Sequence, residues 1–283
     1  MTVKEFLDYL SQELNRSPRT VISYAEDLYA FEAYFLDKDE GLTWETIDTD
    51  IIRDWMESMV DKGNSPSSVA RRLSAVKGFF KFALAREFIS SDPAHAIRSP
   101  KRSRPLPQFL KENEINDLLD KQAWGDDFKG LRDRLIIMMF YETGVRLAEL
   151  VGMDDEAVNL AGQFIKVTGK GDKQRVIPFG NELKSMIENY VEERNRTVSR
   201  KTEALLVSET GLRIKPDLVQ RIVKENLARF CSLKKKSPHV LRHTFATAML
   251  NHGADIESLK QLLGHSPVSY THLRAHETVL DLV

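Results

Sequence analysis

Residues 89–107 divide the chain into two parts, and this break constrains the fold more than any other feature of the sequence. The stretch holds four prolines and four basic side chains. Proline lacks a backbone N–H and disfavours helix in the residue before it. We therefore expect an extended, exposed linker over 89–107. A first domain is expected over residues 1–88 and a larger one over residues 108–283, and two domains suit a chain of 283 residues.

The first domain carries the same helix-start signal twice. A serine followed by a proline occurs at 17–18 and again at 65–66. Serine is a good N-cap, and proline is favoured at the first helical position. Apolar residues recur with the helical period after both signals, and also over 3–10 and 49–60. The sequence predicts a domain of four helices.

The charges of the first part are segregated along the sequence. Residues 1–61 carry five basic and fifteen acidic side chains, whereas residues 62–104 carry ten basic and two acidic ones. The formal net charge of the whole chain is only −1. A local positive excess of this size favours a surface that faces phosphates. The alternative is a solvated helix face that pairs with the acidic segment beside it.

The second domain mixes helices with a small hairpin. Residues 129–141 contain the apolar run LIIMMFY, which indicates a central helix, and Gly144 fits its end. Apolar and polar residues alternate over 163–168 and 174–179 around a glycine-rich turn, which predicts a β-hairpin. Further helices are expected at 111–119, 146–151, 181–195, 215–230, 238–252 and 255–263. The fold class is therefore mainly α with a small β-sheet: a helical N-terminal domain followed by an α+β domain.

Composition excludes several classes of protein. No run approaches the roughly 18 apolar residues of a membrane span. The acidic N-terminus lacks the basic start and apolar centre of a signal peptide. Cys231 is the single cysteine, which excludes an intramolecular disulfide and a cysteine-based metal cluster. We expect a cytoplasmic protein without a membrane segment.

Two candidate functional residues lie at the start of the helix predicted at 238–252. Ser237 is a good N-cap, and His239 and Arg242 follow three residues apart on one helix face. The N-terminus of a helix presents free N–H groups and a partial positive charge, which suit a phosphate. An ordinary surface helix with an incidental pair is the alternative.

Arg146 begins a helix directly after the helix stop at Gly144. Its guanidinium can donate two parallel hydrogen bonds to an oxyanion, and Glu149 one turn later can steady it. The alternative is an ordinary surface salt bridge between these two residues.

Lys170 lies between two glycines at the tip of the predicted hairpin, where the backbone can approach a ligand closely. The full spacing of a Walker loop is absent. His265 directly follows the glycine that ends the helix at 255–263. A solubilising lysine and a polar residue past a helix end are the alternatives for these two positions.

Arg146, Lys170, His239, Arg242 and His265 together are the residue types that phosphoryl transfer without a metal requires. Arginines neutralise the negative charge that develops on the non-bridging oxygens. A lysine or histidine can protonate the leaving alkoxide. No acidic cluster has the spacing of metal ligands, which disfavours a two-metal nuclease. We expect neither a cofactor nor a metal ion.

The runs that carry these residues resemble the tyrosine recombinase, or phage integrase, family, and most closely its bacterial Xer-type members. The first domain is similar to the family's core-binding domain over residues 17–20 and 65–69. The resemblance implies a helical, SAM-like core-binding domain followed by a tyrosine recombinase catalytic domain. The matching runs of the second domain, in order, are TGVRLAEL at 143–150, GKG at 169–171, HVLRH at 239–243 and LGHS at 263–266.

The resemblance also implies an activity. Such enzymes clamp duplex DNA, cut a strand through a 3′-phosphotyrosine and rejoin it to a 5′-hydroxyl without ATP or metal. It implies that Arg146 and Arg242 hold the scissile phosphate and that Lys170 protonates the 5′-oxygen. His239 would assist proton transfer, and His265 would hydrogen-bond the phosphate. The expected partner is double-stranded DNA, with two sites bound by a homotetramer or by a heterotetramer with a second recombinase.

Tyr270 is the candidate nucleophile, because it is the only tyrosine after His265. The family places its tyrosine further along the chain than these five residues. A tyrosine with a pKa of about 10 needs positive neighbours to react near neutral pH. Residues 269–283 resemble a translated adapter read-through, so we expect the tail from about residue 267 to be non-native; Tyr270 is then a coincidence. A zinc site at His272 and His276 is an alternative that this origin disfavours.

Four functions stay open. The first is a site-specific recombinase for chromosome dimer resolution and segregation, which the lack of an additional arm-binding N-terminal domain favours. The second is a phage or transposon integrase of the same family. The third is a DNA-binding factor without catalysis, and the fourth is an enzyme similar to a type IB topoisomerase.

Overall fold

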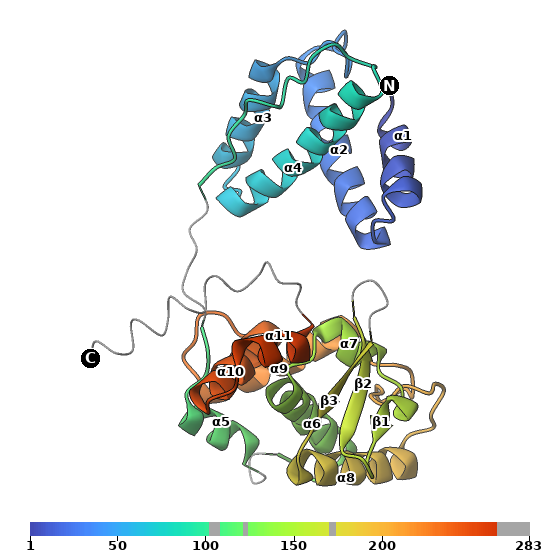
Figure 1. The fold of residues 1–283 in the computed structure, drawn as a ribbon, viewed down its shortest axis with the longest axis vertical. Helices are drawn as coiled ribbons and strands as arrows, with labels where there is room; N and C mark the ends of the chain where they lie inside the picture. The colour runs from blue at the N-terminus through green and yellow to red at the C-terminus, as the bar shows by residue number, and fades with distance from the viewer. Residues whose placement is uncertain (102–107, 121–123, 170–173, 265–283) are drawn as a thin grey trace, which may run out of the picture. The chain divides into compact units, whose positions relative to one another are not determined.

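The computed structural model describes residues 1–101, 108–120, 124–169 and 174–264. The chain divides into two compact units, Met1–Pro105 and Leu106–Val283. Each unit is described by itself below (Figure 1). Among the described helices, none combines the length and the apolar character that crossing a membrane requires.

The four helices predicted for the first unit are confirmed. The Ser17 hydroxyl accepts a hydrogen bond from the Thr20 N–H at 3.3 Å, and the Ser65 hydroxyl accepts one from the Ser68 N–H at 3.2 Å. Both predicted N-caps therefore satisfy a backbone donor that a helix start leaves without a partner. The elements are α1 (Val3–Asp8), which continues into the π-helical turn η1 (Tyr9–Glu13), then α2 (Pro18–Lys38), α3 (Thr49–Asp61) and α4 (Pro66–Ala85).

Aromatic rings join the helices of the first unit. Trp44 lies between α2 and α3, and its ring centroid is 4.3 Å from that of Phe79 in α4. The ring centroid of Phe31 in α2 is 5.6 Å from that of the same tryptophan. The Trp44 Nε1–H donates to Glu32 at 2.7 Å, which satisfies the one polar group of the buried ring. The loop before α3 is thereby part of the core.

Most residues of the described part of the linker, 89–101, are exposed as expected, but two of them are buried, and for these the expectation is wrong. Ala94 is fully buried and Ile97 is 5% exposed, both in the core of the first unit. The Thr49 hydroxyl donates to the Pro93 carbonyl at 2.8 Å, and Lys77 donates to the carbonyl of Ile97. Proline content and charge indicated exposure, but two apolar residues between the charges, together with these two hydrogen bonds, hold the segment against the core. Residues 102–107 lie outside the described residues.

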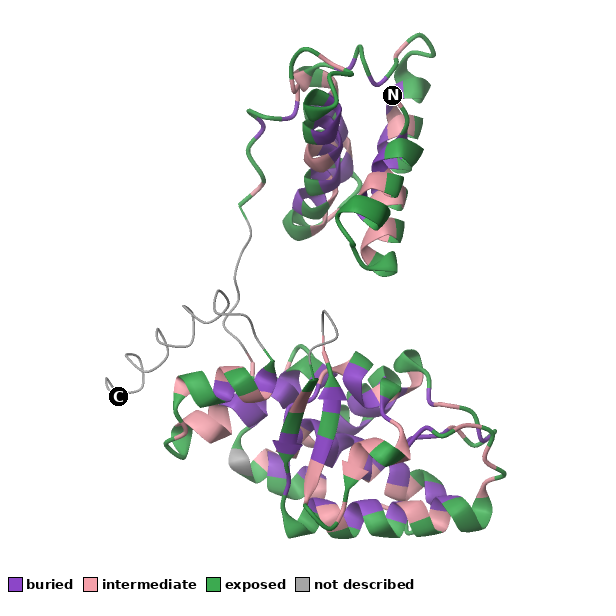
Figure 2. Cartoon of the chain, turned by 45° about the vertical axis from the view of Figure 1, so that its right-hand side comes forward, coloured by how far each residue is buried: buried purple, intermediate pink, exposed green. Residues whose placement is uncertain are grey.

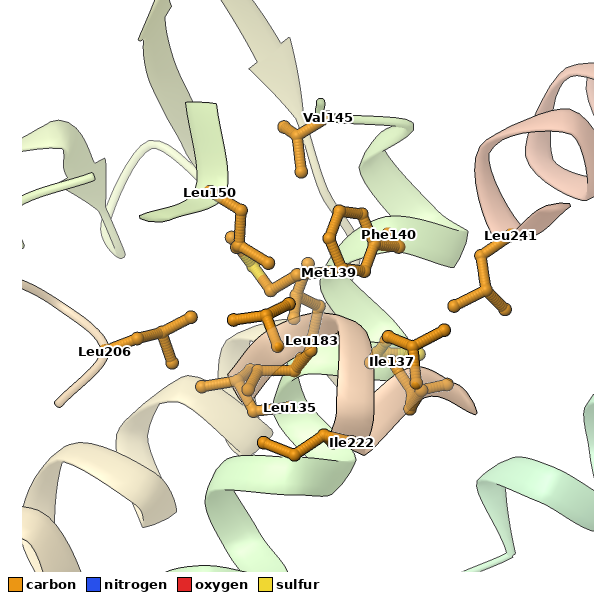
Figure 3. Packing of buried hydrophobic residues seen from close by; sticks show 14 of the residues in the cluster. Leu135, Ile137, Met139, Phe140, Val145, Leu150, Leu183, Leu206, Ile222 and Leu241 are labelled. Atoms are coloured by element: carbon orange, nitrogen blue, oxygen red, sulfur yellow. The ribbon is translucent and has the colours of Figure 1, made fainter. Parts of the chain in front are cut away.

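The second unit is built around α6 (Phe128–Thr143). Figure 3 shows Leu135, Ile137, Met139 and Phe140 of this helix surrounded by apolar side chains of other elements. The prediction of a central apolar helix is confirmed. The other helical elements are α5 (Glu112–Leu119), α7 (Leu147–Gly152), the 3-10 turn η3 (Asp155–Ala157), α8 (Asn181–Thr197), α9 (Pro216–Phe230), α10 (Pro238–Asn251) and α11 (Ile256–Leu263).

A three-stranded antiparallel sheet covers one side of the second unit. Its strands, in the order β1-β2-β3, are β1 (Val158–Asn159), β2 (Phe164–Thr168) and β3 (Gln174–Pro178). Ile165 pairs with Ile177, and both are buried, whereas Lys166 and Val176 on the opposite face are exposed. Figure 2 shows buried and exposed residues alternating along the strands of the sheet. The predicted hairpin is confirmed. A strand of two residues, such as β1, is too short to show a period.

Gly144 ends α6 as the sequence predicts. It has a left-handed backbone conformation with φ +59°, and its N–H donates to the Phe140 carbonyl at 3.1 Å. Glycine adopts this conformation without steric cost. The turn directs the chain from the central helix straight into Arg146 and α7.

Candidate active site

Three of the predicted site residues line one cavity. It has a volume of about 190 Å³ and lies at the N-terminus of α10. His239 is exposed, Arg146 is partly exposed, and Arg242 is 8% exposed. The cavity therefore combines two arginines and one histidine with the positive end of a helix. Its lining residues are Val145, Arg146, Leu147, Gln220, Ser237, Pro238, His239 and Arg242.

Arg242 joins the ends of two helices that are distant in the sequence. Its guanidinium donates to the carbonyl of Gly144, just after α6, and to the carbonyl of Leu263 in α11 at 2.7 Å. A buried guanidinium needs such acceptors because burying a cation without partners is costly. These bonds fix the side chain where it borders the cavity, so the alternative of an incidental surface pair is wrong for Arg242.

Arg146 is the N-cap residue of α7, and Glu149 accepts hydrogen bonds from its backbone and from its side chain. The backbone N–H is 2.7 Å from Glu149 Oε2, and Nη1 is 2.8 Å from Oε1. The Glu149 side chain is only 4% exposed and that of Arg146 is 33% exposed. The salt bridge of the alternative is present, but it is not an ordinary surface pair, because its carboxylate is buried.

Arg175 is a third arginine at the site, and it has no role among the sequence predictions. Its Nη1 and Nη2 donate to the two oxygens of Glu149 at 2.8 and 2.9 Å, and its Nε donates to the Leu262 carbonyl at 2.7 Å. It lies in β3 opposite Val167, whose side chain is buried. An arginine at an inward position of an alternating strand is the signal that identifies it from sequence.

The end of α11 is held by all three arginines. The consecutive carbonyls of Leu262, Leu263 and Gly264 accept hydrogen bonds from Arg175, Arg242 and Arg146, respectively. The last carbonyls of a helix have no partner within the helix, and they carry a partial negative charge. The guanidinium groups donate the missing hydrogen bonds to these carbonyls, and their positive charge offsets the partial negative charge of the helix end. We call these three carbonyls and three arginines the arginine clamp.

Glu149 should contribute to stability in a pH-dependent way. Burial raises its pKa, but hydrogen bonds from Arg175 and from the Arg146 backbone outweigh burial and lower the pKa to about 2 from 4.5. A carboxylate with a depressed pKa stabilises the fold above its unfolded pKa. That contribution, about 3 kcal/mol, is lost as the pH falls from about 4.5 to about 2.

Urea unfolding of the Glu149→Gln variant at pH 7 and at pH 3 tests this expectation. The variant should be less stable than the unsubstituted protein at pH 7, and the difference should shrink at pH 3. Glu257→Gln is the control, because the Glu257 side chain is 70% exposed in its pair with Lys260. An equal loss of stability by Glu149→Gln at both pH values would contradict the prediction.

Three of the predicted site residues, Lys170, His265 and Tyr270, lie outside the described residues, as do His272 and His276. The described strands on either side of Lys170 end at Thr168 and begin again at Gln174. Within the part of the chain that the structure describes, no group of three or more histidine, cysteine or acidic side chains could hold a metal ion.

Comparisons with known proteins cover nearly the whole chain. Residues 108–279 match the model of the phage integrase family, and residues 3–87 match that of the phage integrase N-terminal SAM-like domain. The tyrosine recombinase XerC of Chlorobaculum tepidum is 35% identical over 97% of this chain and 89% of its own length. The tyrosine recombinase XerD of Staphylococcus aureus is 32% identical over 97% and 93%. The XerH site-specific recombinase, in a crystal structure with a palindromic difH substrate, shares the fold with a TM-score of 0.78 and 21% identity over 99% and 84% of the chains.

Proposed function

Because this chain belongs to the phage integrase family of tyrosine recombinases, we propose that its cavity at the N-terminus of α10 holds the phosphodiester at which DNA is cut and rejoined. The chain is a site-specific recombinase of Xer type. The observation that carries the proposal is the convergence of Arg146, His239 and Arg242 on one cavity, although 96 residues separate the two arginines.

Each side chain around the cavity has a role in this proposal. Arg146 and Arg242 bind the non-bridging oxygens of the phosphate and stabilise the charge that develops on them. His239, at the exposed end of the helix, assists proton transfer with the nucleophile. Glu149 holds Arg146 in place through both its backbone and its side chain. Duplex DNA supplies the phosphate.

The remaining roles rest on the family resemblance. A tyrosine oxygen attacks phosphorus, a 3′-phosphotyrosine forms, and the bond to the 5′-oxygen breaks; in the present sequence Tyr270 is the only candidate for this tyrosine after His265. Lys170 donates the proton that the departing 5′-oxygen takes up, and His265 hydrogen-bonds the phosphate. A 5′-hydroxyl of a partner strand then attacks phosphorus and releases the tyrosine. No net bond energy is lost between the two steps.

We further propose that the protein acts as a tetramer on two DNA sites in chromosome dimer resolution, in the cytoplasm. Relatives named XerC and XerD match 97% of this chain, which favours this role over that of a phage or transposon integrase. A homotetramer and a heterotetramer with a second recombinase differ in one observation. Only the homotetramer recombines two sites when this protein is the sole recombinase present.

Covalent capture on nicked DNA tests the proposed function. Duplexes selected from a random library by binding to the protein would be nicked near the centre, so that the cut strand cannot be rejoined. We expect DNA binding by the present sequence but little covalent adduct, because only five residues separate Tyr270 from His265. A version that carries the C-terminal segment of the Chlorobaculum tepidum XerC after residue 266 should form the adduct.

The residue that carries the adduct shows whether the nucleophile is Tyr270 or a tyrosine of the C-terminal segment taken from XerC. An efficient adduct that mass spectrometry maps to Tyr270 in the present sequence would overturn the expectation of a non-native tail. No adduct with either version would argue against strand cleavage and in favour of a DNA-binding factor. Relaxation of a supercoiled plasmid that lacks the selected site would instead support the topoisomerase alternative.

A further inference from the structure

Arg175 balances the charge of the only carboxylate that the described structure places against Arg146. With Glu149 alone, Arg146 would form a neutral pair and would offer a phosphate little net charge. The second guanidinium gives the group Arg146–Glu149–Arg175 a net charge of +1. Since Coulomb attraction is strong at sites shielded from water, this one unit of charge has a large effect on anion binding.

Arg175 also controls the geometry of the pair. It occupies both oxygens of Glu149, and the Arg146 side chain donates to one of them only, Oε1. A carboxylate without such a partner tends to form a forked, two-bond pair with a neighbouring arginine. In that pairing Arg146 would use a second guanidinium N–H donor to bind Glu149, and this donor could then not bind a phosphate. Arg175 thus limits how much of Arg146 the carboxylate engages.

The third contact of Arg175 extends to α11. Its Nε donates to the Leu262 carbonyl, next to the carbonyls that Arg242 and Arg146 hold. A Cβ placed on Gly264 would lie 3.0 Å from the Arg175 guanidinium and 3.4 Å from that of Arg146. The side chain of Arg175 is 12% exposed, and it does not line the cavity. Arg175 can therefore affect a bound phosphate only through its neighbours.

We propose that Arg175 is a positioning residue for strand cleavage: by holding Glu149 and the Leu262 carbonyl, it keeps the Arg146 guanidinium presented to the phosphate. The inference rests on the proposed function, since it takes the cavity to be the phosphate site. The positioning role of Arg175 in β3 is separate from the proton donation proposed for Lys170. Loss of Arg175 should weaken phosphate binding although Arg175 itself does not contact the phosphate.

Phosphate binding to the full chain tests the role independently of the nucleophile. Inorganic phosphate is the probe, and the Nε–H signals of Arg146 and Arg242 are followed by NMR after assignment with arginine-to-lysine variants. Arg175→Gln should raise the Kd for phosphate about tenfold, because it leaves Glu149 without its second cation. Arg175→Lys keeps the charge but not the fork, and its Kd should lie between the two.

Arg213→Gln is the matched structural control. Arg213 also joins an acidic side chain, Asp154, to a main-chain carbonyl, that of Val151 near the end of α7. Its loss should lower the melting temperature, although less than Arg175→Gln does, because both side chains of this pair are 35% exposed. The Kd for phosphate should be unchanged in this variant, because Arg213 does not border the cavity.

The double variant Arg175→Gln/Glu149→Gln separates positioning from simple support of the fold. Glutamine at position 149 keeps an amide oxygen that can accept a hydrogen bond from Arg146, but it removes the charge that Arg175 balances, so the Kd should return to within about threefold of the unsubstituted protein. Additive losses in the double variant would overturn the inference. So would an unchanged Kd in Arg175→Gln.

A second readout separates this inference from the proposed function. In the version that forms the covalent adduct, Arg175→Gln should slow adduct formation about a hundredfold with a duplex Kd within about threefold. Adduct formation at an unchanged rate would overturn the role of Arg175 while the proposed function stands. Failure of the unsubstituted protein to bind phosphate at Arg146 and Arg242, with no adduct in either version, would overturn both.

Discussion

Replacing Arg242 by alanine should slow covalent adduct formation about a thousandfold, in the version of the protein that forms the adduct. Comparable losses follow removal of a single arginine or oxyanion donor from other phosphoryl- and acyl-transfer sites. Arg242 borders the cavity from a buried position and is held by the carbonyls of Gly144 and Leu263. Alanine removes both the charge and the tie between the ends of α6 and α11.

Three measurements make the expectation specific to the chemical step. The rate of adduct formation should fall while the Kd for the selected duplex changes less than about tenfold, since many phosphate contacts share the binding energy. Arg242→Lys should recover part of the melting temperature but little of the rate, because lysine has no forked donors. Arg229→Ala, an exposed arginine of α9, is the control. A rate within tenfold of the unsubstituted protein would contradict the role of Arg242.

Replacing Gly144 by alanine should destabilise the second unit by about 4 kcal/mol. The left-handed backbone at this residue costs an alanine about 1–2 kcal/mol, and a clash in a packed core adds about 1–3. A Cβ on Gly144 would lie 2.5 Å from a ring carbon of Phe245 and 2.8 Å from a methyl of Leu263. Urea unfolding measures the loss.

Gly152 is the matched control for this substitution. It is the last residue of α7, and a Cβ there would meet no atom within 4 Å. Gly152→Ala should leave the stability unchanged or raise it by up to about 1 kcal/mol, because alanine favours a helix more than glycine does. Equal stabilities of the two variants would show that Gly144 can accept a side chain and that the turn before Arg146 is not strained.

Local signals predicted most of the fold. The caps at Ser17 and Ser65, the apolar run in α6 and the alternation in β2 and β3 all act within one element, and the structure confirms each of them. The predicted membership of the tyrosine recombinase family is confirmed as well. The family can be predicted from motifs and their order along the chain, because neither depends on which residues are in contact in the fold.

Contacts between distant segments could not be predicted in the same way. Gly264 lies 118 residues from the Arg146 guanidinium to which its carbonyl is bonded. Arg175 lies within the predicted hairpin, but the sequence assigns it no role, because its partners Glu149 and Leu262 belong to other elements. Docking of Ala94 was missed for the same reason, since its burial depends on the core that four helices build first.

The roles proposed for Lys170 and His265 follow from the motifs, whereas Tyr270 is a candidate only because it is the one tyrosine after His265. The described residues place three arginines and His239 around or beside one cavity, which is the part of the site that tertiary structure adds. In the proposed function, that part binds the phosphate. The proton donor and the nucleophile are for the adduct experiment to identify.

The arginine clamp grips main-chain oxygen rather than side chains, and every amino acid carries that oxygen. Substitutions at the three gripped positions can therefore alter packing without deleting an acceptor. We therefore expect that the segment after Gly264 can be exchanged between homologous recombinases as a unit, with the junction placed just after the arginine clamp. The attachment of the end of α11 to the three arginines therefore does not depend on which side chains follow Gly264.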